Sequence, residues 1–182
     1  MSGADGGSED IMDLETKAAP VEGVVCDGVR LRGHASLFGL EDGGGDVVAK
    51  GAFADCLARH AHEGQRVKML WQHDPAVVIG VWDIVAEDET GLWVEGRLLD
   101  GVEKAREAGA LVRAGALDGL SIGYRVKRAE RDGAGRRVLT EVELWEVSLV
   151  TFPMLREARV GAKSRPAGLA EALRAARLEW VS

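Results

Sequence analysis

Residues 121–152 read SIGYRVKRAERDGAGRRVLTEVELWEVSLVTF, and they combine strand-like and turn-like segments. Two of its segments, Ser121 to Ala129 and Val138 to Phe152, have the alternating, β-branched pattern of strands. Between them lies Asp132-Gly133-Ala134-Gly135, which is typical of a hairpin turn. The stretch therefore predicts a long antiparallel β-hairpin.

The sequence before the hairpin divides into further strands and two helices. Helices are predicted at Gly51 to His62 and at Val102 to Ala114, the second being rich in Ala, Glu, Lys and Arg. Strands are predicted at Val29 to Phe38, Val67 to Trp71, Val77 to Val85 and Gly91 to Leu99. We therefore predict a β-rich α+β domain of six to eight strands with two inserted helices.

Both ends of the chain differ from this domain in composition. Residues 1–20 are acidic with few large apolar side chains, so we predict a flexible tail there. Residues 161–182 are predicted to form a linker and then a basic amphipathic helix. The domain itself is expected to span residues 21–160.

Composition and charge exclude several classes of protein. A chain of 182 residues is expected to form one main domain. Its net charge of -7 argues against a protein whose main function is to bind nucleic-acid phosphates. It has no apolar run long enough to span a membrane and no secretory signal pattern. Its two cysteines, Cys26 and Cys56, are too few and too far apart for a disulfide framework or a zinc motif. A reducing cytoplasm is therefore expected.

The string Gly119-Leu120-Ser121-Ile122-Gly123 matches the Gly-x-Ser-x-Gly pattern of α/β-hydrolases, but we reject that interpretation. The serine of those enzymes lies between a strand and a helix, and its histidine follows it in sequence. Here a strand pattern follows Ser121, and the last histidine, His73, precedes it. Ser121 is a nucleophile only if a base and an orienting group reach it from elsewhere, and otherwise it is a serine in a Gly-bounded strand.

His73 is the histidine whose surroundings suggest a function. It follows an apolar strand and precedes Asp74-Pro75, so we place it at a strand end or turn, where its pKa can be tuned. A turn histidine bonded to Asp74 is the alternative. We expect the other three histidines to have no catalytic role and to bind no zinc. His34 is expected to be a hydrogen-bonded imidazole in a strand, and His60 and His62 are expected to face solvent.

Glu146 is an acid in a strand whose two faces both look buried. It shares one face with Leu144 and Val150, and a buried carboxylate is costly unless it is paired. A histidine ring would serve as its partner, and pairing with an arginine on an edge strand is the alternative. Glu141 and Glu143 lie nearer the strand entry and are expected to be solvated.

Taken together, these segments resemble the prohead proteases of tailed phages, relatives of which occur in gene transfer agents. The resemblance covers about residues 15–160, in the same order along the chain. The residues that carry it are Gly33 to Gly39, Gly45 to Val48, Gly51 to Phe53, Leu70 to Pro75, Ile79-Gly80, Gly91 to Gly96, Ala116 to Tyr124 and Leu144 to Pro153.

This resemblance implies a serine endopeptidase of capsid maturation. Such an enzyme removes the scaffolding segment of the major capsid protein, and often digests itself, inside the immature capsid in the bacterial cytoplasm. The implied fold is a closed or partly open β-barrel similar to herpesvirus assemblin. The family's nucleophile falls on Ser121, its histidine on His73 and its acid on Glu146, with Glu143 left open as the third member.

The expected partners are the major capsid protein and a second copy of the chain, without nucleic acid, membrane, metal or cofactor. A non-enzymatic scaffold component with the same fold is the rival hypothesis. A cysteine hydrolase is rejected, because Cys56 is expected on a helix and Cys26 beside an Asp-Gly turn. The Ser, His and Glu together favour the enzyme.

Overall fold

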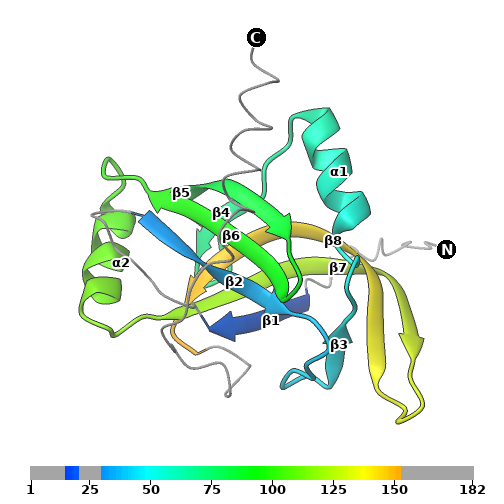
Figure 1. Cartoon of the computed structure of the whole chain (residues 1–182). Coiled ribbons are helices and arrows are strands. Elements are labelled where there is room, and N and C mark those ends of the chain that lie inside the picture. Colours follow the sequence, from blue (N-terminus) through cyan, green and yellow to red (C-terminus); the bar gives the residue numbers. More distant parts are fainter. Residues whose placement is uncertain (1–14, 21–29, 153–182) are drawn as a thin grey trace, which may run out of the picture.

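The computed structural model of the chain describes residues 15–20 and 30–152 (Figure 1). Its strands are β1 (Glu15–Pro20), β2 (Arg30–Leu37), β3 (Asp46–Val48), β4 (Lys68–Trp71), β5 (Asp74–Glu87), β6 (Gly91–Leu98), β7 (Gly119–Arg131) and β8 (Arg137–Val150). Its helices are α1 (Ala54–Glu63) and α2 (Glu103–Arg113). The prediction of a β-rich domain with two inserted helices is confirmed.

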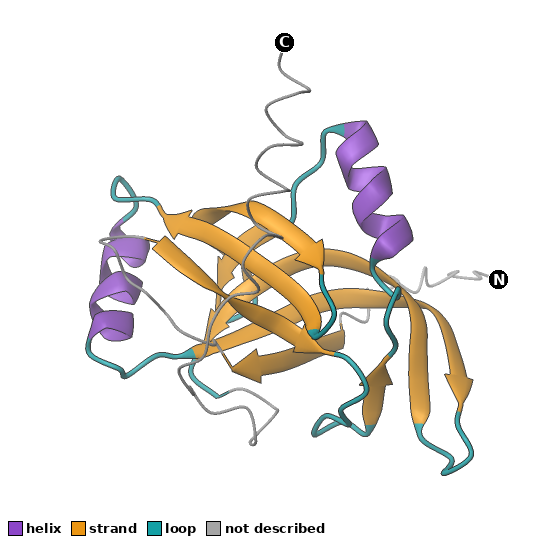
Figure 2. Cartoon of the chain, viewed as in Figure 1, coloured by secondary structure: helices purple, strands orange, loops and turns teal. Residues whose placement is uncertain are grey.

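All of these strands belong to one sheet, in the order β1-β7-β8-β4-β5-β6-β2, and β3 pairs with β8 outside this path. Neighbours are antiparallel except at β8, which runs parallel to β4 and to β3. The sheet curls into a half-barrel, so that β2 at one end of the path lies beside β1 and β7 at the other (Figure 2). The predicted hairpin, β7 with β8, follows β1 in this order.

The hairpin buries its base and exposes its tip. Leu120, Ile122 and Tyr124 of β7 and Leu144 and Val147 of β8 are almost fully buried. Beyond Tyr124, most of β7 is exposed up to the turn. The hydrophobic effect therefore fixes the register at the base of the hairpin, which is where the candidate residues of β7 and β8 lie.

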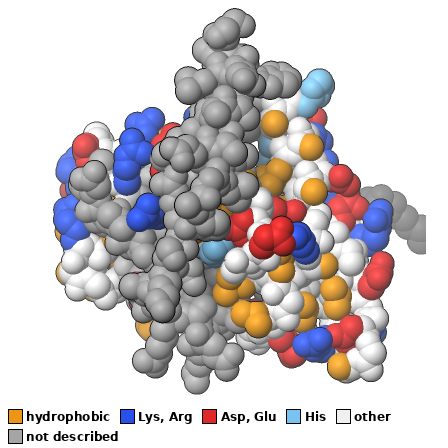
Figure 3. Space-filling model, in the orientation of Figure 1, with side chains coloured by type: hydrophobic (Ala, Val, Ile, Leu, Met, Phe, Trp, Pro, Cys, Tyr) orange, Lys and Arg blue, Asp and Glu red, His pale blue; other side chains and the backbone are white. Residues whose placement is uncertain are grey.

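The two helices cover different strands. Helix α2 packs on β5 and β6 through Ala105, Ala108 and Val112, and basic side chains gather on the side of the molecule that it occupies (Figure 3). Helix α1 packs on β8 and β5 and buries Cys56 and His60. The expectation that His60 faces solvent is wrong, because its side of α1 lies against β8. No described helix is long and apolar enough to span a membrane.

The predicted acidic tail is wrong for residues 15–20. These residues form β1 and pair antiparallel with Gly119 to Tyr124 of β7. Backbone pairing with an available strand orders a segment whose composition alone would not. Residues 1–14, the predicted boundary near residue 160, and the predicted linker and helix over residues 161–182 lie outside the described residues.

The approach of β2 to β6 gives a test of the fold. A Cβ at Gly91 would lie 1.9 Å from the carbonyl oxygen of Ser36, whereas a Cβ at Gly101 would meet nothing within 4 Å. We expect Gly91→Ala to lower the free energy of unfolding by more than about 2 kcal/mol and Gly101→Ala to change it by less than about 0.5 kcal/mol. Denaturant titration measures both, and equal stability of the two variants would contradict the β2–β6 pairing.

Candidate active site

Strand β8 brings together three segments that are far apart in sequence. Ser148 of β8 lies opposite Ser121 of β7 on one side and Leu70 of β4 on the other. Two residues earlier, Glu146 lies opposite Gly123. Because side chains two residues apart share a face of a strand, Ser121, Glu146 and Ser148 belong to the same face of the sheet.

His73 reaches this face from the turn between β4 and β5. Gln72 and His73 have φ angles of 52° and 62°, in the left-handed region that non-glycine residues rarely adopt. The turn is anchored on β8, because the Gln72 amide donates to the Leu149 carbonyl at 2.9 Å and the His73 amide donates to Ser148 Oγ at 3.1 Å. These bonds offset the backbone strain and aim the imidazole at β8.

The imidazole of His73 lies between Ser121 and Glu146. Its Nε2 is 2.7 Å from Ser121 Oγ, and its Nδ1 is 2.5 Å from Glu146 Oε1. Ser121 and Glu146 are only 2% and 3% exposed, whereas the His73 side chain is 22% exposed. The structure thus brings Ser121, His73 and Glu146 together, with the ring at the edge that solvent reaches.

Two further residues shape this group, and the sequence analysis assigned neither of them a role. Ser148 Oγ donates to Glu146 Oε2 at 2.6 Å, so both carboxylate oxygens have partners although the group is buried. Gly123 leaves the space in which the carboxylate lies, because a Cβ there would be 2.1 Å from Glu146 Oε1. The spacing of Glu146 and Ser148, two polar residues on one face of an apolar strand, is the signal from which such a pair could have been predicted.

The position of Ser121 confirms that this serine does not lie in a nucleophile elbow. Ser121 is an interior residue of β7, which continues as a strand to Arg131. An elbow would instead turn from a strand into a helix directly after the serine.

Glu143, the alternative third member, lies in a different environment. Its carboxylate pairs with Arg59 of α1 and lies 3.8 Å from Lys127 Nζ and 3.6 Å from His60 Nε2. Burial opposes its ionisation, but Arg59 and Lys127 outweigh that effect and hold the pKa of Glu143 below its usual value. The expectation that Glu143 is solvated is wrong, because α1 covers this part of β8 and leaves its side chain 16% exposed.

Three of the remaining candidates lie on other elements of the fold, His34 on β2 and Cys56 and His62 on α1. His34 is buried in a strand, as one of its expected roles required, with Nε2 2.7 Å from Asp88 Oδ2 and its ring edge-on to Trp93. His62 is exposed on α1, as predicted. Cys56 is a buried residue of α1, and Cys26 lies outside the described residues.

Known proteins resemble this chain in both sequence and fold. Residues 14–170 match the sequence profile of the caudovirus prohead serine proteases. The prohead protease of Enterobacteria phage HK97 is 33% identical over 140 residues, which are 75% of this chain and 61% of that protein. The chain thus spans less than two thirds of the length of this relative.

Among solved structures, the capsid assembly protease of bacteriophage T4 has a similar fold. The TM-score is 0.63 at 16% identity, and the match covers 77% of this chain and 98% of the T4 chain. At that identity the likeness concerns the fold alone. The sequence match over residues 14–170, by contrast, covers most of the chain, and we conclude that the chain belongs to the caudovirus prohead serine protease family.

Proposed function

We propose that the chain is a serine endopeptidase in which Ser121 is the nucleophile, His73 the general base and Glu146 the residue that orients His73. The observation that carries this proposal is the position of the His73 ring, 2.7 Å from Ser121 Oγ and 2.5 Å from Glu146 Oε1. A serine hydroxyl needs a base within this distance, and the base needs a partner for its second nitrogen.

The contacts of His73 support the tautomer that the reaction needs. Glu146 accepts a hydrogen bond from Nδ1–H, which leaves Nε2 with a lone pair directed at the Ser121 hydroxyl. As Ser121 Oγ attacks the scissile carbonyl carbon, Nε2 takes the hydroxyl proton. The buried carboxylate of Glu146 stabilises the imidazolium that forms.

The same groups complete the cycle. The tetrahedral intermediate collapses when the imidazolium gives its proton to the leaving amine, and the acyl group stays on Ser121. Water, deprotonated by His73, then attacks the ester carbonyl and releases the second product. Because His73 is the most exposed of the three, water reaches it without displacing Ser121 or Glu146.

For the substrate, we propose the scaffolding segment of the major capsid protein, and the chain itself, inside the immature capsid of a phage-infected bacterium. Family membership and the 33% identity to the HK97 prohead protease support this substrate. A barrel like that of herpesvirus assemblin and a relation to gene transfer agents stay predictions. A non-enzymatic assembly component would need no hydrogen-bonded Ser, His and Glu, so the contacts of His73 favour the protease.

The first test is co-expression with the major capsid protein of the same phage. We expect Ser121→Ala and His73→Ala to abolish removal of its N-terminal segment, because nucleophile and base act as a unit worth at least about 10³-fold in rate. Mass spectrometry of the capsid protein's N-terminus and of both termini of the protease reads the outcome. Normal processing by either variant, with folding checked by circular dichroism, would favour the non-enzymatic component.

The role of Glu146 as the residue that orients His73 is tested by matched substitutions on β8. We expect Glu146→Gln to slow processing about 10²- to 10⁴-fold, because an amide neither fixes the tautomer of His73 nor stabilises its cation. Glu141→Gln, which only loses an exposed ion pair with Arg128, should process normally. Strong loss in Glu143→Gln with near-normal rates in Glu146→Gln would move the role to Glu143.

Ser148 is the proposed positioning residue. Ser148→Ala removes the donor to Glu146 Oε2 and the acceptor for the His73 amide, so it should lower the free energy of unfolding by about 1–3 kcal/mol and slow processing. Ser36→Ala is the matched control, because Ser36 is equally buried and its Oγ has no hydrogen-bond partner among the described residues. Equal effects of the two variants in denaturant titration would show that Ser148 does not hold the site.

A further inference from the structure

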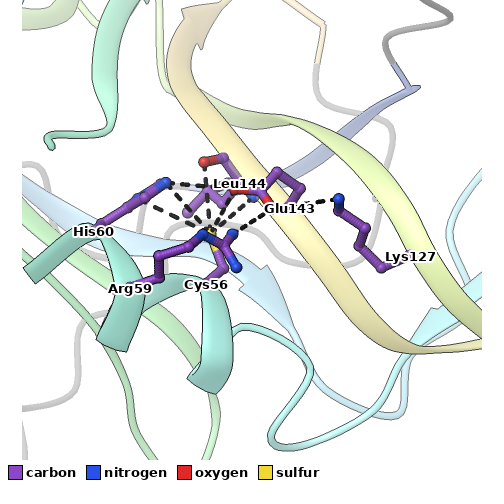
Figure 4. Close-up of polar contacts among 6 residues, drawn as sticks. All are labelled: Cys56, Arg59, His60, Lys127, Glu143 and Leu144. Atoms are coloured by element: carbon purple, nitrogen blue, oxygen red, sulfur yellow. Dashed lines mark hydrogen bonds and ion pairs between the residues drawn. The ribbon is translucent and has the colours of Figure 1, made fainter. Parts of the chain in front are cut away.

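A second cluster of chemically active side chains lies where α1 packs on β8. Cys56 and His60 are four residues apart on α1 and point the same way, toward Glu143 of β8 (Figure 4). Cys56 is 2% exposed and His60 8% exposed. Sulfur, imidazole nitrogen and carboxylate oxygen therefore meet in a largely buried place, and the proposed reaction uses none of them.

The three donor atoms form a nearly equilateral triangle. Cys56 Sγ lies 3.6 Å from His60 Nε2 and 3.7 Å from Glu143 Oε1, and these last two atoms are 3.6 Å apart. An ion at or just above the centre of such a triangle is about 2.1–2.3 Å from every corner, the bond length of zinc to nitrogen, oxygen and sulfur ligands. The spacing is that of one face of a tetrahedral zinc site.

We propose that Cys56, His60 and Glu143 form a site for a zinc-like divalent cation. A thiolate, an imidazole and a carboxylate are the ligand types that Zn²⁺ takes in proteins, and the thiolate and the carboxylate contribute two negative charges. Binding replaces the thiol proton of Cys56, which leaves to solvent. No other described residues form a cluster of this kind.

Groups behind the ligands hold them in place. Arg59 donates to Oε2 of Glu143, which leaves Oε1 as the oxygen that faces the sulfur. The Leu144 amide donates to Cys56 Sγ at 3.2 Å, a contact that stabilises a thiolate. Such outer contacts orient metal ligands and tune their basicity.

Three protein ligands leave a fourth position for water. His60 and Leu144 line a cavity of about 520 Å³ that opens beside the cluster, together with Gln65 and Lys68. Of the three ligands only His60 lines this cavity, so a cation that approaches from this side would meet the imidazole first. The ion would join α1 to β8 three residues before Glu146.

The alternative is a buried thiol held by weak hydrogen bonds. Cys56 Sγ lies 3.7 Å from Glu143 Oε1 and 3.8 Å from the Leu144 carbonyl, which are long contacts even for sulfur. A thiol alone needs no imidazole beside its carboxylate acceptor. The convergence of three different donors is what a cation explains and a single S–H does not.

The test uses the reduced, tag-free, full chain with Zn²⁺ and, as a spectroscopic probe, Co²⁺. We expect one ion per chain with a Kd of about 1 μM or below, and a thiolate-to-Co²⁺ charge-transfer band with the visible absorption of a four-coordinate ion. Zn²⁺ should also raise the Tm, because the three ligands converge only in the folded chain.

Matched variants locate the ion. His60→Ala and Cys56→Ser should weaken binding at least about 100-fold, whereas His62→Ala on the same helix and Cys26→Ser should bind as wild type does. If His60→Ala or Cys56→Ser fails to fold, the metal affinity of Glu143→Gln is compared with that of Glu141→Gln, since both substitutions preserve the shape of the side chain. Weaker binding by Glu143→Gln alone would then support the site. No binding, no charge-transfer band, or equal affinity in His60→Ala and His62→Ala would overturn the site. The Ser121→Ala variant, which lacks the proposed nucleophile, should bind the cation as wild type does. The cation site can therefore be tested separately from the proposed protease activity.

Discussion

The buried carboxylate of Glu146 is the constraint around which the candidate active site is built. A charge that is 3% exposed on a β-strand is stable only with partners for both oxygens, and His73 and Ser148 supply them. Gly123 across the hairpin leaves the necessary space. The strained turn at Gln72 and His73 is held to β8 by the same network.

Strand β8 serves as the common support of both clusters in this molecule. It pairs with β7 and β4, which places Ser121 and His73 near Glu146. It also contacts α1, which carries the residues that lie beside Glu143. The proposed nucleophile group and the proposed cation site therefore share one strand but no residue. A change in the register of β8 would disrupt both, since a shift by one residue moves every side chain to the other face.

Local patterns in the sequence predicted the hairpin, both helices and the need of Glu146 for a partner. They did not predict β3, which has only three residues, or β1, whose order comes from pairing with β7. The contact between His73 and Glu146 depends on the parallel pairing of β4 and β8, which local patterns do not reveal. Its prediction therefore came from the family resemblance. The predicted solvent exposure of His60 and Glu143 is wrong because α1 covers β8, a tertiary contact that periodicity does not reveal.

In the proposed mechanism His73 activates Ser121. The reaction of the full chain with a fluorophosphonate, followed by mass mapping of the modified peptide, tests this activation. We expect one adduct per chain, on Ser121, and no adduct in the His73→Ala variant under the same conditions, because the hydroxyl then lacks its base. An adduct on another residue, or equal labelling of Ser121 without His73, would contradict it.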